Sequence, residues 1–154
     1  MTPETPQLNE HNKQEYPPMH TAEHLLNATM DKMFGCGRAV SAHVERKKSK
    51  CDYLFGTPPT DEEIAAVEAA VNAAIKAGYP VTYQFITHEE AAREFNMSRL
   101  PDNASETLRV VRIGDYDACL CVGLHVENTA EIGGFKIISH DFADGRLRIR
   151  FKLA

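Results

Sequence analysis

The spacing of hydrophobic residues predicts two amphipathic helices in the first half of the chain. In residues 22–34 the apolar positions recur at intervals of three and four, which is the period of one helix face, and a glycine follows. A second apolar stripe covers positions 64–75. Thr60 and Glu63 have the spacing of a capping box, and Gly78 is typical of the position after a last helical turn. We therefore expect the second helix to lie between Thr60 and Gly78.

The rest of the apolar pattern predicts mainly strands. Residues 38–45 and 51–55 are expected to form a hairpin across the basic turn between them, and Pro80 precedes a strand over residues 81–86. A second capping-box sequence, from Thr87 to Glu90, predicts a short helix that reaches about residue 95. Four further strands are expected at residues 108–113, 118–122, 135–140 and 146–153.

The order of these elements decides the predicted fold class. A helix, a hairpin, a second helix, a strand and a short helix are followed by a run of strands. A doubly wound parallel sheet needs a regular alternation of strands and helices, which the chain does not have. We therefore predict an α+β fold in which helices cover an antiparallel sheet, with no internal repeat.

Length and composition predict one domain with a short arm before it. A chain of 154 residues, of which 43% are hydrophobic, can bury a substantial core. Residues 1–18 contain four prolines and few apolar residues. They are expected to form an extended N-terminal arm, and residues 19–154 a single domain.

The chain lacks the sequence features of secreted and membrane proteins. No apolar run approaches the ~20 residues that cross a bilayer, and the first residues have neither the basic nor the apolar region of a secretory signal. We therefore expect a cytoplasmic protein without membrane contact. In that reducing compartment its four cysteines are predicted to be free thiols.

Charge is distributed unevenly along the chain. The net charge of -5 does not indicate a nucleic-acid-binding protein, but two segments are basic. In the last predicted strand alternate side chains share a face, so the basic residues there form one stripe. Such a stripe is either a solvated sheet face that protects an edge or a surface that binds phosphate groups, and the sequence favours neither. The residues concerned are Arg46, Lys47, Lys48 and Lys50 in the turn, and Arg146, Arg148, Arg150 and Lys152 in the strand.

Two pairs of residues have the spacing of metal ligands. His20 and His24 are four residues apart in the first predicted helix, so their side chains project from one face, opposite the main apolar stripe. Cys121 and His125 have the same interval. Because residues four apart in an extended strand are ~13 Å from each other, a shared ion requires the chain to turn, and Gly123 permits this.

Each pair has an ordinary alternative interpretation. His20 and His24 could be two surface histidines, and Cys121 could be a buried thiol in a strand. Together, however, the pairs supply three imidazoles and one thiolate, which is the right number and type of ligands for tetrahedral zinc. We therefore predict one zinc ion per chain, bound by His20, His24, Cys121 and His125.

Three stretches of the chain resemble a known family. They are His20-Thr-Ala-Glu-His24-Leu-Leu, residues 108–114, and residues 121–139, which begin Cys121-Val-Gly-Leu-His125. They resemble the editing domain of alanyl-tRNA synthetase and its free-standing relatives, the AlaX-type deacylases, and the resemblance runs from about residue 19 to about residue 140. The related domain of threonyl-tRNA synthetase has the same two pairs, but residues 129–133, Thr-Ala-Glu-Ile-Gly, look more like the alanyl branch.

The resemblance implies a specific activity. A protein of this family is a zinc-dependent aminoacyl-tRNA deacylase that acts in trans: it hydrolyses the ester between alanine tRNA and a wrong amino acid, serine or glycine, and so serves translation fidelity. Carried over by position, the four predicted ligands hold the metal, and Thr21 and Thr129 contact the substrate. The basic segments would then bind the acceptor end of the tRNA. The oligomeric state is left open.

The second motif departs from the family pattern. The family commonly has Glu-Leu-Cys-Gly-Gly-Thr-His, whereas this chain has Cys119-Leu-Cys121-Val-Gly-Leu-His125. An acid, a glycine and a hydroxyl are thus replaced by Cys119, Val122 and Leu124, which bears on substrate choice and activity. Two alternative functions follow: a zinc-stabilised RNA- or partner-binding module without activity, and a hydrolase of a different aminoacyl ester.

Four protein ligands also conflict with catalysis. A zinc ion with four protein ligands is a closed structural site, whereas a catalytic site keeps one position for water or substrate. One of the four ligands is therefore expected to be displaced, and the sequence does not indicate which.

Overall fold

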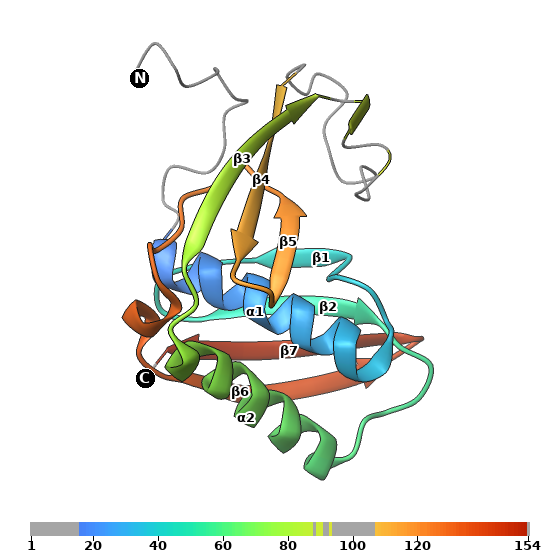
Figure 1. Cartoon of the computed structure of the whole chain (residues 1–154). Coiled ribbons are helices and arrows are strands. Elements are labelled where there is room, and N and C mark those ends of the chain that lie inside the picture. Colours follow the sequence, from blue (N-terminus) through green and yellow to red (C-terminus); the bar gives the residue numbers. More distant parts are fainter. Residues whose placement is uncertain (1–15, 88, 91–92, 94–106, 154) are drawn as a thin grey trace.

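The computed structural model describes residues 16–87, 89, 90, 93 and 107–153 (Figure 1). Within these residues two long helices and a short 3-10 helix accompany two antiparallel sheets, so the predicted α+β class is confirmed, with the strands divided between two sheets. In chain order the elements are α1 (Pro17–Phe34), β1 (Ser41–His43), β2 (Ser49–Leu54), α2 (Asp61–Ala77), β3 (Val81–Thr87), β4 (Thr107–Ile113), β5 (Asp117–Leu120), η1 (Thr129–Ile132), β6 (Phe135–Ala143) and β7 (Arg146–Leu153).

The larger sheet supplies one wall of the core. Its strand order is β1-β2-β7-β6, and both long helices contribute side chains to the core cluster on its apolar face. In β7 the side chains of Leu147, Ile149 and Phe151 are fully buried, and the residues between them are more exposed. The predicted alternation of this strand is therefore confirmed. The predicted hairpin is confirmed as well, because β1 and β2 pair antiparallel.

The start of α2 and the ends of both helices lie where the sequence predicts them. In the capping box of α2, the Glu63 N–H donates to Thr60 Oγ1 over 3.1 Å, and the Thr60 N–H donates to Glu63 Oε1 over 2.9 Å. Gly35 follows α1 and Gly78 follows α2, with φ of 65° and 69°, a left-handed conformation that glycine adopts without steric cost. α1 begins at Pro17, inside the segment expected to form the arm.

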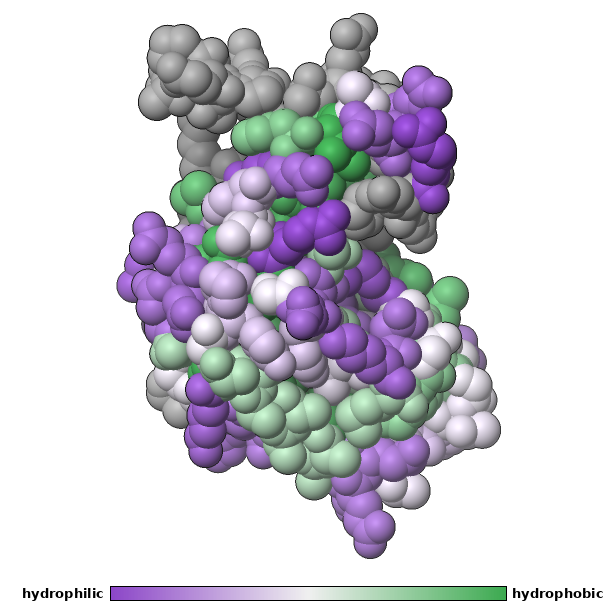
Figure 2. Space-filling model, in the orientation of Figure 1, coloured by the Kyte–Doolittle hydropathy of each residue, from purple (hydrophilic) through white to green (hydrophobic). Residues whose placement is uncertain are grey.

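The predicted apolar stripe of α2 is buried, and its outer face is rich in alanine. This outer face is visible as a pale green band across the lower half of Figure 2. The amphipathic pattern therefore orients the helix as expected. The buried residues are Ile64, Val67, Val71, Ala74 and Ile75, and the exposed alanines are Ala65, Ala66, Ala69, Ala73 and Ala77.

α1 lies between the two sheets, and the sequence does not predict this. The smaller sheet, with strand order β3-β4-β5, rises above the helix, and β5 reaches down to it (Figure 1). At this contact the Arg38 guanidinium donates two hydrogen bonds to Asp117, over 2.7 and 3.1 Å. Every residue from Met19 to Met30 is buried. The helix face that carries His20 and His24 is therefore an interior face.

Most of the basic stripe on β7 is paired with acids. Asp52 on β2 accepts hydrogen bonds from Arg148 over 2.8 and 2.9 Å, and it lies 3.4 Å from Arg146 Nη1. Arg150 Nη1 lies 2.6 Å from Asp141 Oδ2. The hydrogen bond from Arg148 lowers the pKa of Asp52, so this carboxylate stays charged. Phosphate binding by the stripe stays a prediction.

Several expectations concern segments at the limits of the described residues. Thr87 and Glu90 form the predicted capping box, in which the Glu90 N–H donates to Thr87 Oγ1 over 3.2 Å. Apart from residues 89 and 93, the remainder of that predicted helix lies outside the described residues, as do residues 1–15 of the predicted arm. The four cysteines are free thiols, as expected. In the part of the chain that the structure describes, no helix is long and apolar enough to span a membrane.

Candidate metal centre

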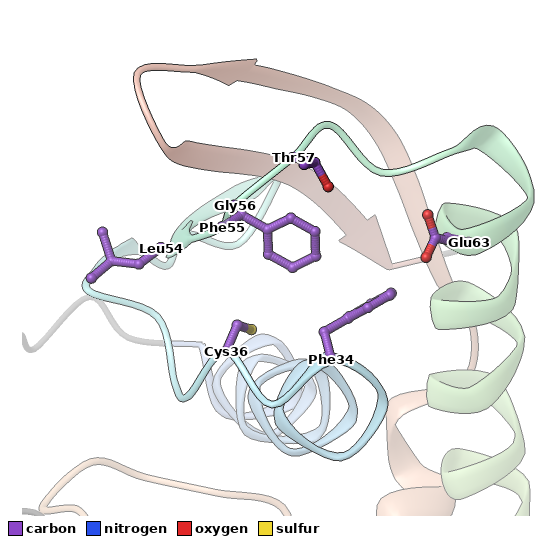
Figure 3. Close-up of a pocket in the computed structure, with 7 residues that line it drawn as sticks. All are labelled: Phe34, Cys36, Leu54, Phe55, Gly56, Thr57 and Glu63. Carbon is purple, nitrogen blue, oxygen red and sulfur yellow. The ribbon is translucent and has the colours of Figure 1, made fainter.

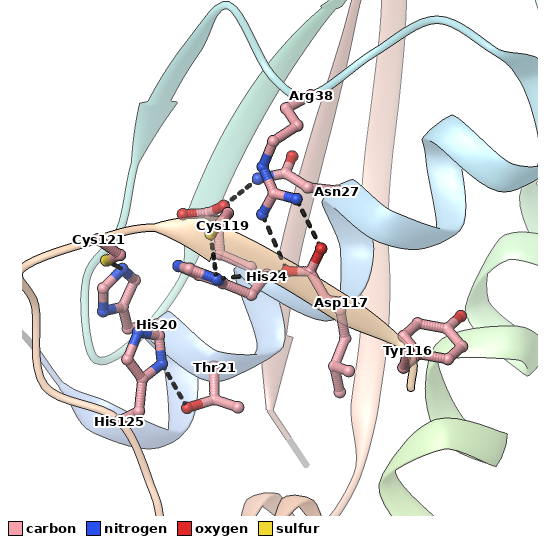
Figure 4. Close-up of polar contacts among 12 residues, drawn as sticks. His20, Thr21, His24, Asn27, Arg38, Tyr116, Asp117, Cys119, Cys121 and His125 are labelled. Carbon is pink, nitrogen blue, oxygen red and sulfur yellow. Dashed lines mark hydrogen bonds and ion pairs between the residues drawn. The ribbon is translucent and has the colours of Figure 1, made fainter. Parts of the chain in front are cut away.

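The structure brings together the four residues predicted to bind zinc. His20 and His24 come from α1, and Cys121 and His125 come from the segment after β5 (Figure 4). One possible ligand atom from each lies within 4.8 Å of the others. The three imidazole rings are also in contact, with centroids 4.2, 4.5 and 4.8 Å apart. Residues 101 positions apart in the chain, such as His20 and Cys121, thus share one site.

The chain turns between Cys121 and His125, as a shared ion requires. Arg109 on β4 holds this turn, because its Nε donates to Cys121 O over 2.8 Å and an Nη donates to Gly123 O. The Cys121 N–H donates in return to Arg109 O over 3.1 Å. These bonds fix the backbone of the turn, so that the Cys121 thiol and the His125 ring face the same point.

A backbone carbonyl sets the tautomer of His20. His20 Nδ1 lies 3.1 Å from Leu124 O. Because a carbonyl oxygen only accepts hydrogen bonds, Nδ1 carries the ring proton, and Nε2 of the neutral ring keeps its lone pair. His20 Nε2 lies 3.4 Å from Cys121 Sγ. His20 therefore directs an unprotonated nitrogen at the shared point.

Asp117 and Cys119 hold the Nδ1 side of His24. Nδ1 lies 3.5 Å from Asp117 Oδ2 and 3.1 Å from Cys119 Sγ, and Arg38 holds the carboxylate from the other side (Figure 4). Burial lowers the pKa of His24, but the contacts with Cys119 and Asp117 outweigh it and the pKa is raised. With Nδ1 engaged, Nε2 is left for the shared point, which is the usual arrangement of a carboxylate-supported metal ligand.

Thr21 orients the third imidazole. His125 Nδ1 lies 2.9 Å from Thr21 Oγ1, and this oxygen also accepts the Val126 N–H over 3.2 Å. His125 Nε2 is buried and has no hydrogen-bond partner among the described residues. Burial lowers the pKa of His125 to about 4, so the ring is neutral at pH 7. A buried imidazole nitrogen without a partner is costly, and a metal ion at the shared point would satisfy it.

Cys121 completes the set of donors as a thiolate. Burial raises its pKa, but the interactions with the three neighbouring histidines outweigh this and lower the pKa to about 2. The thiolate is the form of cysteine that binds zinc. Three imidazole nitrogens and one thiolate sulfur are a donor set typical of zinc, so the residues present fit the predicted ion.

Asp117 supplies an acid near the position where the motif lacks one. The family has Glu at the position of Cys119, and this chain has an acid two residues earlier. In the register of β4 and β5, Ile113 faces Asp117 and Val111 faces Cys119, so both β5 side chains project to the same face of the sheet. Asp117 was not predicted as a site residue. The alternation that places residues 117, 119 and 121 on one face is the signal that points to it.

Replacing Asp117 by Asn is expected to weaken zinc binding by about 10- to 100-fold, because a neutral amide holds the His24 N–H less strongly and loses the ion pair with Arg38. The measurement is competition for zinc with a chromophoric chelator at pH 7. Asp115→Asn, at an exposed position in the same β4–β5 turn, is the matched control and should bind zinc like the unchanged protein. Equal affinities of the two variants would contradict the role given to Asp117.

The two predicted substrate residues lie inside the protein. The side chains of Thr21 and Thr129 are fully buried. Thr21 uses its hydroxyl to position His125, whereas Thr129 Oγ1 donates to Ala74 O over 3.0 Å and accepts the Tyr79 N–H over 2.9 Å. Thr129 thereby attaches η1 to the end of α2. Direct contact of either hydroxyl with a substrate stays a prediction.

The basic turn lies at the same end of α1 as the predicted ligands. The Arg46 guanidinium lies 4.5 Å from the centroid of the Tyr16 ring. Tyr16 immediately precedes α1, and its carbonyl accepts the His20 N–H over 3.0 Å. The turn that contains Arg46, Lys47, Lys48 and Lys50 is therefore anchored one helical turn from His20.

A separate cavity of about 340 Å³ lies at the opposite end of α1. The rings of Phe34 and Phe55 lie on two of its sides with centroids 5.1 Å apart, and Cys36 lies beside them (Figure 3). None of the four predicted ligands lines it. This cavity is therefore not part of the candidate metal centre.

Comparison with known proteins matches the segment that contributes Cys121 and His125 to the candidate metal centre. Residues 108–150 match the family described as the threonyl and alanyl tRNA synthetase second additional domain, and they include Asp117, Cys121 and His125. The alanine–tRNA ligase of Fervidobacterium nodosum is 33% identical over 130 residues, which are 84% of this chain. Residues 108–150 thus belong to the second additional domain family, and the similarity to alanine–tRNA ligases extends over most of the chain. The matched segment contains β5 and all of β4 except Thr107, the two strands that support the metal centre.

Further relatives show the extent of the similarity. The alanine–tRNA ligase of Idiomarina loihiensis is 36% identical over 132 residues, and that of Bdellovibrio bacteriovorus is 34% identical over 121 residues. These alignments cover 84% and 78% of this chain. They cover only 15% and 13% of the ligases, and 15% of the Fervidobacterium ligase. This chain thus corresponds to a small part of each relative.

Proposed function

We propose that this second additional domain is a zinc-dependent deacylase that hydrolyses the ester of a mischarged tRNA in trans. The observation that carries the proposal is the convergence of three imidazoles and one thiol, with ligand atoms within 4.8 Å of one another, in a relative of alanine–tRNA ligases. The resemblance to the alanyl branch favours serine or glycine attached to alanine tRNA as the substrate. Such a substrate also favours a cytoplasmic location.

A zinc ion bound here supplies Lewis-acid chemistry, because it polarises an ester carbonyl and lowers the pKa of water towards ~7. The protein's own residues prepare the site. Leu124 O, Asp117 and Thr21 engage the Nδ1 atoms of the three imidazoles, which leaves each Nε2 as a ligand. Cys121 contributes a single negative charge, so a divalent ion keeps the site net positive. A positive site stabilises the negative charge that develops on the ester oxygen during hydrolysis.

We also propose that the acceptor end of the tRNA approaches the His20 end of α1. The turn that begins at Arg46 is anchored there through Tyr16. Lysine and arginine side chains contribute most of the sequence-independent affinity for nucleic acid, so a basic turn beside the centre suits the phosphates of the acceptor end. The stripe on β7 is the second candidate for phosphate binding, although three of its arginines pair with acids.

The decisive test is hydrolysis of Ser-tRNA and Gly-tRNA built on alanine tRNA, with correctly charged Ala-tRNA as the control. We expect the zinc-loaded protein to release serine or glycine and to leave the alanyl ester intact. A chelator should stop the release, and added zinc should restore it, because the Lewis acid is lost and regained. If the zinc-loaded protein hydrolyses none of the three esters, the proposal is wrong.

A binding module without activity is the second candidate. Leu124 occupies the position at which the family has a threonine, and 54% of its surface is exposed beside the ligand pair. An apolar side chain thus takes the place of a hydroxyl at the rim of the centre. Zinc binding and RNA binding without hydrolysis of any aminoacyl ester would support this alternative.

A further inference from the structure

Two exposed aromatic residues of β3 lie on the sheet face that carries the metal centre. In the smaller sheet, Tyr83 on β3 pairs with Val111 on β4, which in turn pairs with Cys119 on β5. Phe85 pairs with Arg109 on β4. Directly paired residues of antiparallel strands project to the same face. Tyr83 and Phe85 are therefore on the same face as Cys119 and, two residues further along, Cys121.

Tyr83 and Arg109 connect this aromatic pair to the ligands. The Arg109 guanidinium lies 4.6 Å from the centroid of the Tyr83 ring while it donates to Cys121 O and Gly123 O. The turn that presents two of the predicted zinc ligands thus holds Arg109, and Arg109 packs against the Tyr83 ring.

The aromatic surface is open to solvent. Tyr83 is 44% exposed and Phe85 38%, whereas Val111, the cross-strand partner of Tyr83, and Ile113 on the same face are fully buried. Flat rings beside a fixed guanidinium are the surface on which proteins stack unpaired nucleobases, because every base has a π-face and arginine adds a cation–π contribution. The surface therefore has the chemistry of a base-stacking platform.

We infer that Tyr83, Phe85 and Arg109 form a stacking platform for the unpaired terminal nucleobase of the RNA substrate. This inference rests on the proposed function. The ester of an aminoacyl-tRNA joins the amino acid to the ribose of the terminal nucleotide, so the reacting carbonyl and the terminal base belong to one small unit. A centre that acts on the ester needs a surface for that base beside it, and Arg109 joins the platform to the turn that carries Cys121 and His125.

The test measures stacking without measuring hydrolysis. The probe is an RNA hairpin with four unpaired 3′ nucleotides, the last of which carries 2-aminopurine, whose fluorescence is quenched when the base stacks. The zinc-loaded full chain should quench it saturably, and the same RNA with an abasic terminal residue should bind at least about 5-fold more weakly, the usual effect of losing one stacked base. No quenching by the unchanged protein would overturn the inference.

Variants of Phe85 separate stacking from general apolar contact. Phe85→Ala should weaken binding by about 5-fold or more, Phe85→Leu should not restore it, and Phe85→Trp should, because only an aromatic ring offers a π-face. Ile138→Ala removes a side chain that is 44% exposed in the other sheet and serves as the matched control. Wild-type affinity in Phe85→Ala would overturn the inference. The inference would also be overturned if Phe85→Ala lost zinc and this loss accounted for its weaker RNA binding.

The binding test and the hydrolysis test can fail independently. If the unchanged protein stacks the terminal base but hydrolyses no mischarged tRNA, the platform is supported and the deacylase proposal fails. If it hydrolyses mischarged tRNA and Phe85→Ala keeps the same KM and the same affinity for the hairpin, the deacylase proposal is supported and the platform is wrong.

Discussion

The Cys121→Ser variant is expected to lose zinc and to hydrolyse mischarged tRNA at least about 100-fold more slowly than the unchanged protein. Serine keeps the shape of cysteine but does not supply the thiolate that the three neighbouring histidines stabilise in this site. A Lewis acid is worth several kcal/mol in the transition state, and each ~1.4 kcal/mol is a factor of ten in rate. Zinc content and the rate of serine release are the measurements.

The same variant is expected to lose the stabilisation that zinc gives to the fold. An ion that binds only the folded chain raises the free energy of unfolding by about 4 kcal/mol when its concentration is 1,000 times its Kd. Thermal unfolding should therefore show a zinc-dependent rise of Tm in the unchanged protein and none in Cys121→Ser. This comparison needs no substrate, so it tests the metal centre even if the protein has no hydrolytic activity.

Cys36→Ser is the matched control for the loss of a thiol. Cys36 lies at the opposite end of α1, where its thiol contacts the carbonyl oxygens of Met30 and Gly37, and a serine hydroxyl can make similar contacts. Zinc content, activity and the response of Tm to zinc should all match those of the unchanged protein. A zinc-dependent rise of Tm in Cys121→Ser as large as that in Cys36→Ser would falsify the ligand assignment.

The Phe151→Ala variant is expected to lose about 3–5 kcal/mol of stability, the usual cost of removing a buried phenylalanine side chain. Phe151 is fully buried in β7, and its ring packs on Phe135 with centroids 5.2 Å apart. Truncation leaves a cavity between the larger sheet and the helices. Because small proteins are stable by only about 5–15 kcal/mol, a large part of the variant should be unfolded at moderate urea concentration. Urea unfolding followed by circular dichroism measures the change.

Leu54→Ala is the control for this core substitution. Leu54 lies on β2, the strand paired with β7, and 57% of its surface is exposed. A change at such a surface position should alter the free energy of unfolding by no more than about 0.5 kcal/mol. If both variants unfolded at the same urea concentration, the burial assigned to Phe151 would be wrong.

The sequence by itself determined the elements whose signals are local. The capping box of Thr60 and Glu63 and the glycine at position 78 act within one or two helical turns, so they mark both ends of α2 without any knowledge of the fold. Alternate burial along β7 follows from the period of a strand in the same way. The four candidate ligands were also predictable, because the suitability of imidazole and thiolate for zinc belongs to the residue types and their spacing.

Only the tertiary structure decided which partners these residues meet. The hydrogen bonds between Arg38 and Asp117 join positions 79 apart, and the contact of Thr21 with His125 joins positions 104 apart. No local period encodes such contacts. The same holds for the burial of the histidine face of α1, which the smaller sheet covers, and for the acids that neutralise much of the β7 stripe. The roles of Asp117 and Thr21 therefore emerge only when distant strands and α1 are packed together, since packing sets which polar groups must satisfy one another in the interior.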